Sequence, residues 1–438
     1  MGSTVQIRHT ARAAGLLVAM MLCTLRASAY PSMMRHGYFG CVTCHADPSG
    51  GSLLTRYGRA QDDLLLTMHY RGAPTAAASR PENFGGFDEF ETGAQPTEAA
   101  QPPVENPADL DTTNPLWGLL TLPSWLLLQG DYRHMTLYKF GRSDAFGTFP
   151  MQADVSGQLE LDWFRANGSI GLTGAGAGSP HGRRAQLTTN QGRGINLLSR
   201  THWLGADFGQ KRFTARAGRI DIPFGMRIPE HTMWVRDATR TDRESDQQHG
   251  VALAYSSELI RGEALVILGN YQIRPDRMRE RGYSAYAEVR AADKIYAGVS
   301  SLVTHAGTDF QSLEDDVTRQ AHGLFARTAP VSALVILAEG DVLLKSRRDL
   351  GYVGFLQLDL ALVQGLHFGA TGELLDAGYL DTGDPFNTLR RIPGFGKPRF
   401  GGWLTVDWFF FQQLEARLDA VARQNDPFTV MAQLHILL

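Results

Sequence analysis

Three residues near the start of the chain have the types and spacing of a covalent haem site. Cys41, Cys44 and His45 stand in the order C-x-x-C-H, which is the attachment sequence for a c-type haem. In such sites the thiols bond to the haem vinyl groups and the imidazole is the proximal iron ligand. A redox dithiol does not need the adjacent histidine. A zinc site needs about four ligands, and the only other cysteine is Cys23. The motif therefore predicts one covalently bound haem c.

The sixth ligand of the iron is left open by the sequence. Candidate donors on either side of the motif are Met33, Met34, His36, Met68 and His69. We favour His36, because it is close to the motif in sequence and is followed directly by a glycine. Met68 and His69 are the alternatives, since a short helix that carries them could fold back over the haem.

The first 29 residues have the pattern of a secretory signal peptide. Arg8 and Arg12 precede an apolar run over residues 13–25, and residues 27–29 form a small-x-small cleavage site. Cleavage there would remove Cys23. No later stretch is an apolar run of about 20 residues, so we expect no transmembrane helix. These features predict an exported protein that is periplasmic, secreted or an outer-membrane barrel.

The mature chain divides into three parts by composition. Residues 30–70 form a small haem segment, with a predicted short helix over Ala60–Tyr70. Residues 71–115 are rich in Pro, Ala, Glu, Thr and Gly and predict a disordered linker. The haem segment is too short to cover a haem alone, so the macrocycle must be covered by another part of the structure or stay partly exposed.

Residues 116–438 predict a mainly β fold. Polar and apolar residues alternate over stretches such as 152–163 and 283–290, as in strands with one polar and one apolar face. We expect about sixteen strands, which start near the following residues: 124, 149, 167, 196, 211, 249, 260, 282, 294, 318, 332, 350, 366, 398, 414 and 427.

The connections between these strands alternate in length. Tight turns are predicted at these pairs: Asn167-Gly168, Gly209-Gln210, Glu258-Leu259, Asp293-Lys294, Ala329-Pro330, Gln364-Gly365 and Gln412-Gln413. Longer loops lie between them, and the charged loop Phe224–His249 is expected to fold into the pore, to line the outer mouth or to stay on the surface. Short turns on one rim and long loops on the other predict a transmembrane antiparallel β-barrel with both ends on the periplasmic rim.

Two residue patterns agree with a barrel in the bacterial outer membrane. Aromatic girdles at the lipid interfaces are predicted from these residues: Trp125, Tyr138, Trp163, Trp203, Tyr255, Tyr271, Trp403 and Trp408. A polar lumen is predicted from these charged residues: Asp154, Glu160, Asp162, Arg212, Arg216, Glu288, Arg290, Glu339, Asp341, Glu415 and Arg417. About sixteen strands enclose more space than their side chains fill, which leaves room for water or for a plug of the size of residues 30–70.

In these features the chain resembles the fused monohaem cytochrome–porins of iron-oxidising bacteria. The resemblance is carried by the haem motif with Pro48 and the stretch Leu54–Arg59, followed by the barrel. The long linker departs from the family's more compact pattern. The resemblance implies a haem at or in the pore that accepts electrons from extracellular iron(II), with a periplasmic electron-carrier protein as partner.

The sequence supports three hypotheses for the function. The first is electron transfer across the outer membrane by one haem c, from or to an extracellular redox metal or another donor or acceptor. The second is a porin for small solutes in which residues 30–70 are a plug or sensor. The third, a haem enzyme such as a peroxidase, needs a distal acid–base residue that the sequence does not identify. The formal net charge of −3 gives no basic face for nucleic acid.

Overall fold

The computed structural model describes residues 31–38, 40–51, 53–68, 113–141, 144–173, 196–230, 232–346, 350–378 and 397–438. The predicted signal peptide and nearly all of the predicted linker lie outside these residues. Within them, no helix has the length and apolar character needed to cross a membrane.

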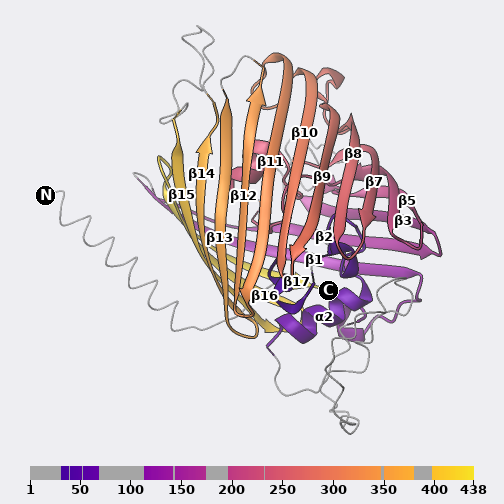
Figure 1. Ribbon diagram of the computed structural model, residues 1–438. Coiled ribbons are helices and arrows are strands. Elements are labelled where there is room, and N and C mark those ends of the chain that lie inside the picture. Colours follow the sequence, from indigo (N-terminus) through magenta and orange to yellow (C-terminus); the bar gives the residue numbers. More distant parts are fainter. Residues whose placement is uncertain are drawn as a thin grey trace, which may run out of the picture.

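Antiparallel strands form one closed sheet, which Figure 1 shows as a tilted barrel. Its strands are β1 (Leu126–Phe140), β2 (Ala145–Leu161), β3 (Phe164–Thr173), β4 (Asn196–Leu198), β5 (His202–Phe208), β6 (Phe213–Ile220), β7 (Gln248–Ser256), β8 (Ile260–Gly269), β9 (Arg281–Ala292), β10 (Ile295–Thr308), β11 (Asp315–Val331), β12 (Leu334–Lys345), β13 (Gly351–Val363), β14 (Leu366–Asp376), β15 (Arg399–Phe411), β16 (Leu414–Arg423) and β17 (Phe428–Leu437).

The strand count agrees with the sequence prediction. β4 and β5 both pair with β3, the first opposite Gly171–Thr173 and the second opposite Phe164–Gly168. They are therefore two pieces of one strand, and the described barrel has sixteen strands around its wall. Pairing of Asp131 with Leu437 through Phe140 with Phe428 joins the first strand to the last and closes the ring. The predicted barrel of about sixteen strands is confirmed.

The alternation of side chains along the strands gives the wall two different faces. These apolar side chains are exposed on the outer face: Val155, Leu159, Leu253, Val266, Leu324 and Leu356. These charged side chains are buried on the inner face: Asp131, Asp154, Glu288, Arg327, Glu339 and Asp419. An apolar exterior with a polar interior is the pattern of a transmembrane barrel.

The prediction of two aromatic girdle residues is wrong. Trp203 and Trp403 are only 2% and 4% exposed and point inward, where their indole N–H groups donate to Asp47 and Glu373. A buried indole needs such an acceptor, and the polar lumen supplies it. Among the predicted lumen charges, Asp162 and Arg212 are instead exposed in turns between strands.

Two of the predicted tight turns are displaced. The β2–β3 turn lies at Asp162-Trp163, and the β11–β12 turn lies at Ser332-Ala333. Gly168 is a ladder residue opposite Gly157. Pro330 lies in an irregularity of the β11–β12 ladder, where its missing N–H costs no hydrogen bond. The other five predicted turns join their strands as expected.

Short helices complete the described chain. They are η1 (Pro31–His36), η2 (Cys41–Thr43), α2 (Arg56–Leu66), η4 (Leu116–Gly118), α4 (Trp234–Thr239) and η5 (Asp276–Met278). The helix predicted over Ala60–Tyr70 is therefore present but spans Arg56–Leu66, so it begins and ends earlier than predicted and does not include Met68. Thr55 is its N-cap, and the Thr55 side chain accepts a hydrogen bond from Gly58 N, which fixes the first turn at Arg56.

Candidate cofactor site in the barrel lumen

The segment that carries the C-x-x-C-H motif lies inside the barrel. Leu54 N donates to the lumen-facing side chain of Gln129 over 2.9 Å, and Arg165 donates to the carbonyl oxygen of Ala46 over 3.3 Å. The C-terminal end of α2 reaches the rim of short turns, where Gln364 donates to Thr67 O over 2.8 Å. In Figure 1 this indigo helix lies at that end of the barrel. The segment thus extends from the turn rim into the lumen.

A buried ion-pair network fixes the loop that follows the motif. Arg216 of β6 pairs with Asp47 of the loop and with Glu263 of β8, and its side chain is fully buried. Asp47 also accepts a hydrogen bond from the indole of Trp203 over 3.1 Å and from Ser49 N over 2.7 Å. A buried pair needs such additional hydrogen bonds to offset its desolvation. Sequence reasoning identified only a turn here and missed this anchor.

The local fold of the motif leaves its three functional groups available for a cofactor. The turn is closed by Cys44 N and His45 N, which both donate to Cys41 O, over 3.2 Å and 2.9 Å. Both cysteines are free thiols. Arg261 of β8 donates to the sulfur of Cys41 over 2.9 Å, so the barrel wall contacts the motif directly.

His45 is arranged as a metal ligand would be. Its Nδ1 is hydrogen-bonded to the carbonyl oxygen of Gly51, so Nδ1 carries the proton and Nε2 keeps its lone pair. Metal-binding histidines usually hold their second ring nitrogen in this way. Burial and the nearby Arg243 lower the pKa of His45 to about 4. The imidazole is therefore neutral at neutral pH, which is the form that binds a metal.

Helix α2 is packed tightly against the motif at Gly58. A Cβ atom at this position would lie 2.1 Å from the carbonyl oxygen of Cys44, which is a backbone atom. The same backbone segment is held by Thr55 N, which donates to Cys44 O over 2.9 Å. The absence of a side chain at Gly58 therefore sets the position of the motif on the helix.

We expect Gly58→Ala to separate α2 from the motif, because the backbone oxygen cannot move away cheaply. Overpacking of this kind costs roughly 1–3 kcal/mol, and the haem bound per polypeptide should fall at least several-fold. Absorption of the purified protein measures this. Gly372→Ala is the matched control, since nothing lies within 4 Å of a Cβ there. Equal haem content in both variants would contradict the packing argument.

The motif faces a cavity of about 1220 Å³, including the part open to solvent. Cys41, Cys44 and His45 all line it. The wall also contains apolar side chains from the N-terminal segment and from the barrel: Met33, Leu54, Leu66, Met226, Phe409 and Leu437. Cofactor sites are typically mostly apolar with a few placed polar groups. Two free thiols, a neutral imidazole and these apolar side chains fit a covalently attached haem: Cys41 and Cys44 would hold the macrocycle, and His45 Nε2 would be the iron ligand.

The long loop between β6 and β7 folds inward and forms another wall of the cavity. Its helix α4 is held by two carboxylates of the wall. Glu373 accepts a hydrogen bond from Trp234 N over 2.7 Å, and Glu339 accepts hydrogen bonds from both terminal nitrogens of Arg236 over 2.8 and 2.6 Å. Met226 and Trp234 belong to the apolar core of the lumen. The sequence left three positions open for this loop, and in the structure the loop lies inside the pore.

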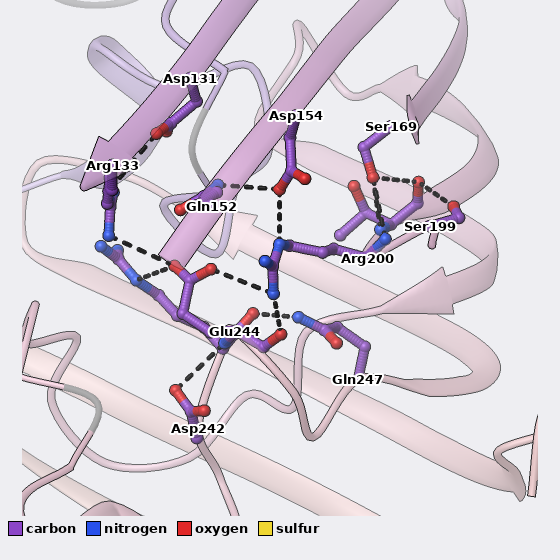
Figure 2. A network of polar contacts seen from close by, with 12 residues as sticks. Asp131, Arg133, Gln152, Asp154, Ser169, Ser199, Arg200, Asp242, Glu244 and Gln247 are labelled. Atoms are coloured by element: carbon purple, nitrogen blue, oxygen red, sulfur yellow. Dashed lines mark hydrogen bonds and ion pairs between the residues drawn. The ribbon is translucent and has the colours of Figure 1, made fainter. Parts of the chain in front are cut away.

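Figure 2 shows how Glu244 connects this loop to the barrel wall. Its carboxylate lies 3.7 Å from Arg133 of β1 and 3.3 Å from Arg200, which follows β4. Arg200 in turn pairs with Asp154 of β2 over 2.5 Å. The loop is thus fixed on both sides, and the lumen is narrowed by the loop and the N-terminal segment together.

Comparison with known proteins identifies the barrel type. No protein-family model and no curated protein matches the chain. Among solved structures, it is similar to OmpF of Salmonella typhi in complex with daunomycin, with a TM-score of 0.52, 9% identity and coverage of 72% of this chain and 97% of that one. It is also similar to in-vitro folded OmpT of Vibrio cholerae in a trimer form, with a TM-score of 0.51, 9% identity and coverage of 72% and 99%. The chain has a porin fold.

Within this porin-like barrel, the candidate sixth ligands occupy different places. Met33 lines the cavity, whereas Met34 is buried in the lumen core. His36 is exposed on η1, and the structure does not bring it to the cavity. Met68 follows α2 and is absent from the cavity wall, and His69 lies outside the described residues. The assignment of His36 therefore stays a prediction, and Met33 is the candidate that already faces the site.

Proposed function

We propose that this chain is an outer-membrane electron-transfer protein that holds one haem c in the lumen of a porin-like barrel. The observation that carries the proposal is the position of Cys41, Cys44 and His45 on a cavity inside the barrel. A bound haem supplies one-electron redox chemistry and cannot diffuse away. The apolar outer face of the barrel suits a hydrocarbon layer about 25 Å tall, which otherwise separates electron donors and acceptors on its two sides.

Each group of the site has a role in this proposal. Cys41 and Cys44 fix one edge of the macrocycle, and His45 presents Nε2 to the iron because Gly51 O holds Nδ1. Met33 and Phe409 give the macrocycle apolar surface to pack against. Electrons are exchanged with an extracellular redox metal, such as iron(II), and with a periplasmic electron-carrier protein that reaches the turn rim.

A second function is favoured by the filling of the lumen. The N-terminal segment and the β6–β7 loop both occupy the space through which solutes pass in a porin. In this alternative the chain is a small-solute porin, and residues 30–70 are its plug. Electron transfer requires the haem, whereas a porin requires a path for solutes through the lumen.

The proposal is tested with the purified full chain in lipid vesicles. We expect the absorption bands of a c-type haem, a reversible one-electron titration, and reduction of an acceptor sealed inside the vesicles by a donor outside. Protein-free vesicles give the background rate. A folded barrel that carries no haem, or one whose haem does not support transfer above this background, contradicts electron transfer and leaves the porin function.

A further inference from the structure

Five arginines line the cavity that contains the C-x-x-C-H motif, and one of them differs from the rest. The five are Arg133, Arg227, Arg243, Arg261 and Arg327. Four of them lie within 4.0 Å of a carboxylate: Arg261 and Arg327 pair with Glu288, Arg133 with Asp131 and Arg243 with Glu244. Arg227 has no hydrogen bond or ion pair within the described residues, and its Nη2 atom is buried without a partner.

Arg227 as a whole is half-buried, but burial of its Nη2 atom without an acceptor is costly, because that nitrogen has lost water and gained nothing in return. Two of the nearby carboxylates are engaged elsewhere. Asp47 and Glu263 both bind Arg216. Asp221 is not within ion-pair distance of Arg227 in the structure, and burial raises the pKa of Asp221 to about 6 even though Arg227 opposes this rise. The Oδ1 atom of Asp221 is buried without a hydrogen bond, and Arg227 also lines the cavity, where an anion of a bound molecule can reach its guanidinium group.

We infer that Arg227 binds a carboxylate of the molecule that occupies this cavity, and that this carboxylate is a haem propionate. The inference rests on the proposed function. A haem attached through its vinyl groups still carries two free propionates, and a guanidinium binds a carboxylate through parallel hydrogen bonds. Arg227 follows Met226 on the inward-folded β6–β7 loop, so this contact also links the loop to the cofactor. The loop is then part of the haem site as well as a constriction of the pore.

The inference predicts a change in the haem potential, since a positive charge beside the haem favours the reduced form. Arg227→Gln should lower the midpoint potential of the full-length protein at pH 7 by at least 59 mV, a tenfold change in the one-electron equilibrium. Arg227→Lys keeps the charge but not the paired hydrogen bonds. It should therefore retain most of the potential while shifting the propionate bending mode in the resonance Raman spectrum.

Arg212→Gln is the matched control. Arg212 is exposed on the β5–β6 turn and lines a small separate pocket beside Cys41, so its loss should leave both the potential and the Raman mode unchanged. If Arg227→Gln behaves like this control, the inference is wrong. It is also wrong if the effect of Arg227→Gln vanishes in an Asp221→Asn background, because Arg227 then acts through Asp221.

Haem quantified per polypeptide separates this inference from the proposed function. A wild-type protein that lacks haem overturns both. A wild-type protein with one haem, together with unchanged Arg227 variants, overturns the propionate contact alone. Haem content and heat-modifiable migration on gels are measured for every variant, and Arg227→Lys provides the Raman readout where the Gln variant fails to assemble.

Discussion

Replacement of Cys41 and Cys44 together by alanine should remove all haem that stays with the protein through denaturing electrophoresis. Thioether bonds survive denaturation, whereas a haem held only by His45 and the cavity wall dissociates. Transfer of electrons into vesicles should fall to the rate of protein-free vesicles. Haem staining of gels and the vesicle assay measure the two effects, and both losses are expected to be complete.

The barrel itself should assemble normally in this double variant. Cys41 contacts the wall through Arg261, which keeps its ion pair with Glu288, and the anchor at Asp47 and Arg216 does not involve the thiols. Cys23→Ala is the matched control, because Cys23 lies in the predicted signal peptide and its loss should change nothing. Haem staining that persists in the double variant, or transfer above background without staining, would refute the covalent haem site.

The barrel could be predicted from the sequence because its signals are local. Alternation of polar and apolar residues specifies the two faces of each strand, and the predicted starts near residues 260, 366 and 414 coincide with strands of the structure. The inward direction of Trp203 was also readable. It shares a face with Gly205 and Asp207, whereas Leu204 and Phe208 are exposed on the other face. An aromatic residue near a strand end can therefore belong to a girdle only where the alternation places it on the outer face.

Turn positions were less predictable, because turn propensity is a weaker constraint than strand pairing. Asn167-Gly168 has a favourable turn composition, yet both residues lie in ladders with β2 and β5. The actual turn uses Asp162 at a φ of 54°, a conformation that aspartate tolerates better than most residues. Pairing over the whole length of β2 and β3 therefore outweighs the local preference.

The candidate cofactor site likewise has one part that local sequence predicts and one part that depends on the closed barrel. The motif was predictable from its short spacing, whereas the hydrogen bond from His45 to Gly51 is local in the sequence but was not predicted. The partners supplied by the barrel, such as Arg216 for Asp47 and Arg227 for the cavity, lie far away in the sequence. Nothing in the local pattern distinguishes them from other arginines of a polar lumen. Only the closed barrel brings them together with the motif.

Deletion of residues 30–115, with the predicted signal peptide retained, should raise the single-channel conductance in planar bilayers several-fold above that of the full chain. The segment 40–68 fills lumen space and contacts the wall at Gln129, Arg165 and Arg216. The barrel should tolerate its loss, since Arg216 keeps Glu263 as a partner. Conductance should stay limited by the β6–β7 loop, because Glu339 and Glu373 continue to hold it after its contacts with Met34 and Gly50 are lost.

A shorter deletion within the linker is the matched control. Asp63 and Trp117, on either side of the linker, both bond to Gln412, over 3.3 Å and 3.1 Å. The linker therefore needs to span only a short distance, and removal of residues 75–105 should leave the segment in the lumen and the conductance at the wild-type level. If the full deletion conducts no better than this control, the β6–β7 loop alone closes the pore. If the full deletion conducts more than this control, residues 30–70 block the pore. The proposed haem segment would then also be the plug, and the barrel would pass electrons without passing solutes.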